Sequence, residues 1–458
     1  MAMQSENVRR LVLRYFLLLL FLFGGGSDLQ VVASDQIPAP PQDHPIALKG
    51  GTIHPVSGPA IPDGTLLFSD GKIDALGTEV KVPEGAEVID ISGQHIYPGF
   101  IAATSTLGLV EIPLARATRD FDETGNITPE VRAEVAINPD SELLPVARSN
   151  GITTALTIPQ GGLISGTSAA ILLDGWTWED MTLQAPVGLH IRWPSMRIRH
   201  EKSFPKSVEE QQKAIDGKIE RIRETFRNAA AYQQALRTQS TQESVSPGTS
   251  VRWEAMFPVL DGDIPVFVHA NEIRQIQAAV DWADEQGVDM VLVGGQDAWR
   301  VTDLLRAREI PVILESTSMR LPARNWEGYD TPMTAPKKLH DAGVPFCISL
   351  SEHPFASQFQ RNLPYEAAAA AAYGLPREVA LKAVTLYPAQ ILGIADRVGS
   401  LEPGKDATFI ITDGDPLEIT TQVRMEFIQG RKIDLSNRQT ALYRKYRTKY
   451  QQLDLIEE

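Results

Sequence analysis

Short apolar runs alternate with amphipathic segments over most of the chain after residue 98. The runs predict buried strands, and the segments with apolar residues three or four apart predict helices. The predicted strands lie at 100–106, 153–158, 187–191, 265–270, 290–293, 311–314 and 346–350, with helices at 272–286, 297–308 and 336–342 among those between them. Strand–helix alternation at this spacing is typical of parallel βα units, about eight of which close into a barrel of ~250 residues or more. We therefore expect an α/β fold with a (β/α)8 TIM-like barrel.

A second set of short strands, at 46–48, 65–68, 72–76 and 87–91, precedes the barrel. Gly50-Gly51, Asp63-Gly64 and Asp70-Gly71 separate these strands as turns, and two further strands follow the barrel at 408–412 and 424–428. The boundaries we predict are 1–34 for a signal peptide, 35–45 for a linker, 46–97 and 399–436 for the two parts of a small β-sandwich, 98–398 for the barrel and 437–458 for a C-terminal helix.

The N-terminus has the pattern of an export signal. Basic residues precede the apolar run Tyr15–Phe23, and Val32-Ala33-Ser34 offers small residues at a cleavage point. The run is short for a bilayer span, which needs ~20 apolar residues, and an uncleaved anchor is the alternative. We expect an exported protein of the periplasm or cell envelope, with no stable membrane span after signal removal. The single cysteine, Cys347, lies in an apolar strand and is expected to be buried packing.

The charge of the chain limits the classes of partner. The net charge is −15 at pH 7, whereas nucleic-acid binding requires a basic surface. A solvated acidic surface that aids solubility is the plainer use of this charge. A small-molecule substrate or ligand is the expected partner, and homo-oligomer formation is left open.

Two segments carry a family resemblance. Tyr97-Pro98-Gly99-Phe100 is a turn leading into the first barrel strand, and 387–393 with 399–407 form the pattern where the chain leaves the barrel. Over residues 46–435 the chain resembles the amidohydrolase superfamily, and within it the exported imidazolonepropionase-like branch. The resemblance implies hydrolysis of non-peptide carbon–nitrogen bonds, such as those of cyclic amides. A metal then polarises a carbonyl and activates water, and an aspartate takes the proton.

Most of the positions at which that family binds metal carry other residues here. The His-x-His pair of the first strand corresponds to Thr104 and Thr106, and the sixth-strand histidine to Gly294. The aspartate of the eighth strand corresponds to Ser351, while His269 retains the fifth-strand histidine. Hydroxyl groups are poor ligands for transition metals unless they are deprotonated.

A reduced site remains conceivable from the resemblance. His190 and His269, together with Glu352 or His353, could hold zinc or another divalent metal, and absence of any cofactor is the equal alternative. Glu352 could replace Ser351 as the catalytic base if the register shifts by one residue. Because neighbouring residues of a strand face opposite ways, such a shift is disfavoured.

The substrate pocket is expected to include Gln160, Gly161, Gly162, Asn271 and His353. The glycine-rich stretch 159–167 has no phosphate-binding signature, and it is either a lid loop or a structural turn. Two functions stay open: a hydrolase with a rebuilt site, or an inactive, metal-free barrel that binds a small molecule in the cell envelope. A third, purely structural role would use the terminal helix around 443–447 as its contact.

Overall fold

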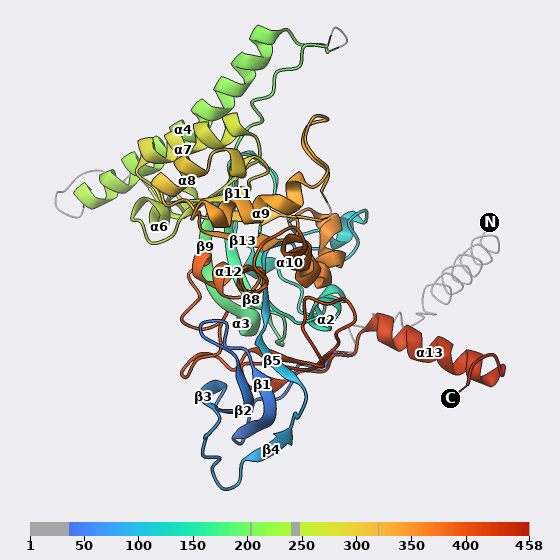
Figure 1. Ribbon diagram of the computed structural model, residues 1–458. Helices are drawn as coiled ribbons and strands as arrows, with labels where there is room; N and C mark the ends of the chain where they lie inside the picture. The colour runs from blue at the N-terminus through green and yellow to red at the C-terminus, as the bar shows by residue number, and fades with distance from the viewer. Residues whose placement is uncertain (1–35, 202–203, 240–247, 319, 458) are drawn as a thin grey trace, which may run out of the picture. The chain divides into compact units, whose positions relative to one another are not determined.

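The computed structural model describes residues 36–201, 204–239, 248–318 and 320–457. The predicted signal peptide therefore lies outside the described residues. The described chain contains two eight-stranded sheets, one of them a barrel and the other separate from it (Figure 1). No helix in these ranges is long and apolar enough to cross a bilayer.

The barrel sheet is nearly closed, which confirms the predicted (β/α)8 TIM-like fold. Its strands pair in chain order: β6 (Phe100–Ser105), β7 (Ile152–Thr157), β8 (Ile164–Leu172), β9 (Thr182–Arg192), β10 (Val266–Ala270), β11 (Met290–Gly294), β12 (Val312–Glu315) and β13 (Phe346–Ser349). The first and last strands meet where the Thr104 N–H donates to Ser349 Oγ at 2.9 Å.

One strand of the barrel runs against the others, which differs from the all-parallel prediction. β8 pairs antiparallel with both β7 and β9, and all nine of its residues are buried. The stretch 159–167, which we expected to be a loop, therefore ends inside a strand. The connection from β7 to β8 is too short for a crossover helix, so the chain has to return antiparallel.

Helices cover the outer face of the barrel (Figure 1). In α7, for example, Ile276, Ala279 and Ala283 are buried at helical spacing, and Gly287 ends the helix in the left-handed region at φ +67°. The helices are α2 (Leu143–Arg148), α3 (Trp178–Met181), α4 (Val208–Gln239), α5 (Val251–Glu254), α6 (Phe257–Leu260), α7 (Ile273–Gln286), α8 (Thr302–Ala307), α9 (Thr331–Asp341), α10 (Leu363–Ala372), α11 (Arg377–Lys382), α12 (Leu386–Ile391) and α13 (Arg438–Gln452), with 3-10 turns η1 (Arg116–Thr118), η2 (Glu134–Ala136), η3 (Ala298–Arg300) and η4 (Pro354–Asn362).

The separate sheet combines strands from both sides of the barrel in the sequence. Its order is β16-β15-β14-β5-β1-β2-β3, with β4 paired to β1. The strands are β1 (Ile46–Ile53), β2 (Ile61–Ser69), β3 (Lys72–Gly77), β4 (Glu87–Asp90), β5 (His95–Pro98), β14 (Phe409–Thr412), β15 (Val423–Ile428) and β16 (Arg431–Lys432). Because β5 pairs with β14, the chain enters and leaves the barrel at neighbouring strands.

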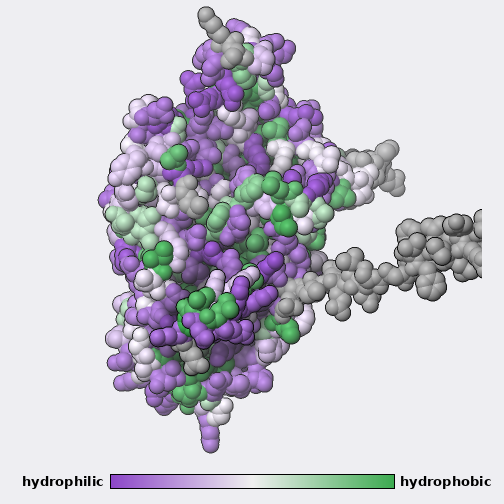
Figure 2. Space-filling model, turned by 90° about the vertical axis from the view of Figure 1, so that its right-hand side faces the viewer, coloured by the Kyte–Doolittle hydropathy of each residue, from purple (hydrophilic) through white to green (hydrophobic). Residues whose placement is uncertain are grey.

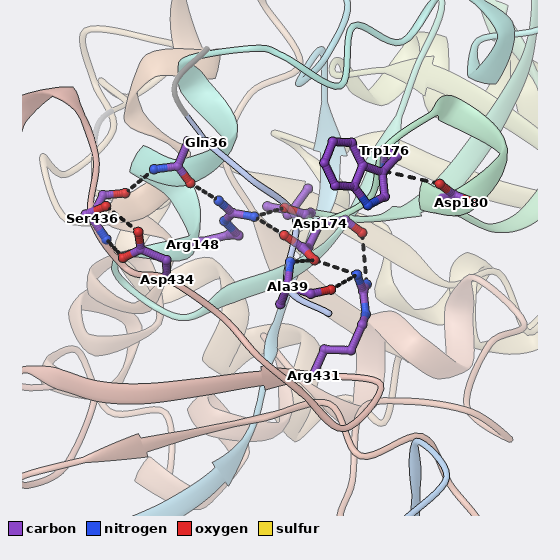
Figure 3. Close-up of polar contacts among 10 residues, drawn as sticks. Gln36, Ala39, Arg148, Asp174, Trp176, Asp180, Arg431, Asp434 and Ser436 are labelled. Atoms are coloured by element: carbon purple, nitrogen blue, oxygen red, sulfur yellow. Dashed lines mark hydrogen bonds and ion pairs between the residues drawn. The ribbon is translucent and has the colours of Figure 1, made fainter. Parts of the chain in front are cut away.

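A buried ionic network ties the barrel to this sheet (Figure 3). Asp174, which follows β8, pairs with Arg148 of α2 and with Arg431 of β16, each at 2.6 Å. The backbone N–H of Ala39 donates to the same carboxylate, and Gln36 accepts a hydrogen bond from Arg148. Asp174 thus holds barrel, sheet and N-terminal segment together.

We expect Asp174→Asn to destabilise the fold strongly. Removing one partner from a buried ion pair leaves an uncompensated charge, which costs about 3–5 kcal/mol, and here two arginines lose their partner. Urea unfolding followed by circular dichroism measures the free energy of unfolding. Asp180→Asn is the matched control: Asp180 is exposed and accepts one hydrogen bond, from the Trp176 N–H, so we expect a loss below about 1 kcal/mol. Equal losses in the two variants would contradict this role of Asp174.

Candidate functional site

The carboxyl ends of the barrel strands bring five ionisable side chains together. They are His190 and Arg192 on β9, His269 on β10, Glu315 at the end of β12 and Glu352 just after β13. His190 Nδ1 lies 2.8 Å from His269 Nε2, and His269 Nδ1 lies 3.3 Å from Glu352 Oε1. Arg192 donates to the same Glu352 oxygen, and the Glu352 N–H donates to Glu315 Oε1 at 3.0 Å. Active sites of this fold lie at this end of the barrel.

The two histidines form a neutral relay towards Glu352. Burial lowers the pKa of both imidazoles, and of His190 most strongly. With His269 Nδ1 donating to the Glu352 carboxylate, its Nε2 must accept from His190 Nδ1. This assignment leaves His190 Nε2 as an unprotonated acceptor, and that buried nitrogen has no hydrogen-bond partner among the described residues.

The two glutamates have opposite pKa shifts. Burial alone would raise the pKa of Glu352, yet it lies well below its usual range because His269 and Arg192 contact the carboxylate. Since His269 is neutral near pH 7, the permanent charge of Arg192 is what keeps Glu352 ionised. Burial, followed by the charge of Glu352, raises the pKa of Glu315 to about 7. At neutral pH the site therefore pairs one ionised carboxylate with one carboxyl group that retains its proton about half the time.

Glu315 and Arg192 are not among the site residues predicted from the sequence. Each is a charged residue that ends an apolar strand, in Val312-Ile313-Leu314-Glu315 and Leu189-His190-Ile191-Arg192. In a barrel, a charged residue at the carboxyl end of a strand faces the region where active sites lie. That pattern could have indicated both residues.

A small pocket opens beside Glu315. Its lining includes Gln296, Ser316 and Arg320, and Arg320 makes no ion pair with any residue that the structure describes. Ser316 has φ +53°, a strained backbone conformation for a residue other than glycine, and such strain is often found at binding sites. The pocket therefore presents a half-protonated carboxyl group and a guanidinium that has no ion-pair partner among the described residues.

Glu366 of α10 holds the loop after β12 in place. Its carboxylate accepts from the backbone N–H groups of Thr317 at 2.5 Å and Ser318 at 2.7 Å, and from both hydroxyl groups. Loop residues fixed by a buried carboxylate do not have to be ordered again when a ligand binds.

Thr104 and Thr106, at the positions where the family binds metal, help to close the barrel. The Thr104 hydroxyl contacts Ser349 Oγ at 3.0 Å and donates to the Leu350 carbonyl. The Thr106 hydroxyl lies 2.6 Å from Ser357 Oγ. Both threonines are fully buried, so neither hydroxyl group is available to a ligand in the barrel mouth.

Gly294 leaves no room for a sixth-strand histidine. Its φ is +92°, and a Cβ built there would lie 2.7 Å from Asn271 Oδ1. A side chain at this position would be strained in its backbone and would displace Asn271. That Asn271 oxygen already accepts from the Gln296 N–H and from Arg320.

The residues present do not fit the metal that the family implies. The 2.8 Å between the two histidine nitrogens is a hydrogen-bond distance. Two ligands of a tetrahedral zinc, each at 2.0–2.1 Å, would lie about 3.3 Å apart. Arg192 adds a cation beside Glu352, the carboxylate that contacts His269. Over the described ranges, no group of three or more His, Cys, Asp or Glu residues could hold a metal ion.

Glu352, rather than Ser351, faces the histidines. Because β13 ends at Ser349, the alternation of side chains along a strand does not apply to either residue. Ser351 Oγ accepts from the His353 N–H at 3.2 Å. His353 is exposed, with its ring against Phe355, so it lies apart from the cluster of five.

The remaining pocket candidates lie around the same mouth. Gln160 Nε2 donates to the Glu352 carbonyl at 2.5 Å, which fixes the segment after β13. Gly161 and Gly162 both have positive φ and form the turn between β7 and β8. A Cβ on Gly162 would meet the Asn126 carbonyl at 2.6 Å, so this turn is tightly packed.

Comparison with known proteins identifies the lineage. The model of the amidohydrolase family matches residues 184–436, which is more than half of the chain. This chain belongs to the amidohydrolase family. Among solved structures, an amidohydrolase from Thermotoga maritima MSB8 is 27% identical, with a TM-score of 0.75, over 85% of this chain and 99% of that one.

Related sequences and more distant structures agree with this family. The chain is 25% identical over 395 residues to amidohydrolase tasK of Hapsidospora irregularis, covering 80% of this chain but 39% of that relative. It is 22% identical over 399 residues to an imidazolonepropionase of Syntrophobacter fumaroxidans, covering 80% of this chain and 86% of the relative. An adenosine deaminase from Xanthomonas campestris with bound zinc shares the fold, with 17% identity and a TM-score of 0.51 over 91% of this chain and 100% of that one.

The raised pKa of Glu315 predicts a specific pH dependence of stability. Between about pH 4.5 and 7 the folded state keeps a proton that the unfolded state has lost, so Glu315 lowers the stability as the pH rises. Glu315→Gln removes this effect, and its stability relative to the wild type should rise by about 3 kcal/mol across that window. Urea unfolding at a series of pH values measures the difference. The exposed Glu84→Gln is the control, and a Glu315→Gln profile parallel to the wild type would contradict the assignment.

Proposed function

We propose that this amidohydrolase family member binds a small molecule carrying a carboxylate at the barrel mouth, without the metal-assisted hydrolysis of its relatives. The observation that carries the proposal is the use of the first-strand positions. The hydroxyl groups of Thr104 and Thr106 are engaged with the segment after β13. A metal site that uses the first-strand positions, as the family's does, would have to break those contacts before it could form.

The charged groups in the pocket indicate which chemical class of ligand would bind there. Arg320 is a guanidinium without an ion-pair partner among the described residues, and guanidinium groups bind carboxylates through two parallel hydrogen bonds. Glu315 can donate its proton to a second oxygen or to an amide carbonyl, because its pKa of about 7 leaves it partly protonated. Together they suit a small amide that also carries a carboxylate.

Hydrolysis of a non-peptide carbon–nitrogen bond is the second candidate, favoured by the opposite shifts of Glu315 and Glu352. The ionised Glu352 would take a proton from water as it attacks the amide carbonyl. Protonated Glu315 would give its proton to the leaving nitrogen as the carbon–nitrogen bond breaks. Pairs of carboxyl groups with separated pKa values perform such acid–base work in other enzymes.

We expect the purified protein to bind no metal stoichiometrically. After incubation with excess zinc and desalting, mass spectrometry should find well below one equivalent per chain. The zinc-containing adenosine deaminase from Xanthomonas campestris, treated in parallel, is the positive control. One equivalent retained by this chain, together with amide hydrolysis that is lost on chelation, would overturn the metal-free proposal.

Arg320→Gln should weaken binding of a small carboxylate. Hydrogen bonds to charged groups contribute about 1.5–3 kcal/mol, so the dissociation constant of N-acetylglycine should rise roughly 10- to 150-fold. Isothermal titration calorimetry measures the binding, with Arg306→Gln on the surface of α8 as the control. Binding of the uncharged methyl ester with equal affinity would contradict the carboxylate assignment. Release of acetate from the bound probe would favour the hydrolase.

A further inference from the structure

The C-terminal helix α13 has no buried residue. Leu442, Tyr446, Tyr450 and Leu453 recur at helical spacing and are all exposed, so they form one stripe, with Tyr443 beside it. A helix of 15 residues without buried contacts is marginally stable in water. We therefore expect the exposed stripe of α13 to be covered by a surface that is not part of the described chain.

The charge of α13 is opposite to that of the whole chain. Its five charged residues are all basic, whereas the whole chain carries −15. At 100° per residue, Lys445 and Lys449 flank the stripe on one side and Arg447 on the other. Aromatic residues between basic flanks are the pattern of helices that lie in the interface of a membrane.

The place where α13 begins adds a second observation. Asn437 caps the helix, accepting from the backbone N–H groups of Gln439 and Thr440. One residue earlier, the Ser436 carbonyl accepts from Gln36 Nε2 at 2.7 Å, and Figure 3 shows both beside the Arg148 and Asp174 pair. Gln36, the first described residue, therefore lies beside the base of α13.

We propose that α13 binds to the surface of an anionic lipid bilayer. Tyrosine rings suit the boundary between headgroups and acyl chains, since each has an apolar body and a polar tip. The basic flanks would contact lipid phosphates, while the acidic remainder of the chain would be repelled by them. Figure 2, turned by 90° from Figure 1, shows several hydrophobic areas among the hydrophilic surface of this side of the molecule.

A lipid surface fits these observations better than a protein partner. The apolar run Tyr15–Phe23 predicts either a signal that delivers the chain through a membrane or an anchor that keeps it there, so the chain would meet a membrane in either case. Electrostatic attraction by each basic residue near an anionic surface is worth about fivefold in affinity. The helix can therefore strengthen the binding of the chain to the membrane surface without spanning the bilayer.

Vesicle co-sedimentation of the full chain tests this proposal. We expect binding to vesicles of phosphatidylglycerol and phosphatidylcholine to exceed binding to phosphatidylcholine alone, and to fall as salt is raised. Lys445→Glu with Lys449→Glu should weaken binding to the anionic vesicles at least 25-fold. Tyr446→Ser with Tyr450→Ser should weaken it as well and reduce its persistence at high salt. Lys213→Glu with Lys218→Glu, exposed on α4, is the matched control and should bind like the wild type.

The alternatives give different results in the same experiment. Equal binding to neutral and anionic vesicles that is unchanged in the α13 variants would overturn the proposal. It would mean that the apolar run Tyr15–Phe23, rather than α13, binds the lipid. Sedimentation velocity without vesicles tests a second copy as the occupant. A dimer that is lost in the α13 variants, combined with unaltered vesicle binding, would also overturn it. Circular dichroism establishes that each variant is folded.

Discussion

The contact between the first barrel strand and the end of the last one constrains the whole site. Thr104 contacts Ser349 and Leu350, and Thr106 reaches Ser357 beyond them. In a barrel made from a single sheet, the first and last strands must be joined to close it. Here buried hydroxyl groups at the mouth make this connection, and the same positions would carry the metal-binding imidazoles that the family resemblance implies.

The permanent charge of Arg192 has one of the electrostatic effects that a bound metal would have. A divalent ion at the mouth of such a barrel would keep nearby carboxylates ionised and histidines neutral. In this chain Arg192 keeps Glu352 ionised, while burial, together with the positive charge of Arg192, keeps His190 and His269 neutral. The mouth therefore retains an ordered set of charges, although a guanidinium cannot activate water as a Lewis acid does. Function follows from this altered site rather than from the fold, which many family members share.

The two ends of the barrel have different physical roles. At the carboxyl ends of the strands lies a pocket that contains Glu315, Ser316 and Arg320. Ser316 is strained, Glu315 is partly protonated, and Arg320 has no ion-pair partner among the described residues, so these groups remain open to a ligand. At the opposite end, the buried Asp174 carboxylate joins Arg148, Arg431 and the backbone of Ala39. Glu426 lies close to this network, and burial raises its pKa well above the usual range.

The sequence by itself determined the strand–helix alternation, the family and the positions at which metal ligands are absent. These properties follow from local patterns, since apolar periodicity and turn dipeptides depend on neighbouring residues. Only the tertiary structure decided that β8 runs antiparallel, because a short connection and barrel closure together set its direction. It also decided that Glu352 faces His269 and that Glu315 lies beside it. Both placements depend on contacts between strands distant in sequence. A charged residue at a strand end could have indicated Glu315 as a mouth residue, but no local pattern encodes the direction of the Glu352 side chain in the loop after β13.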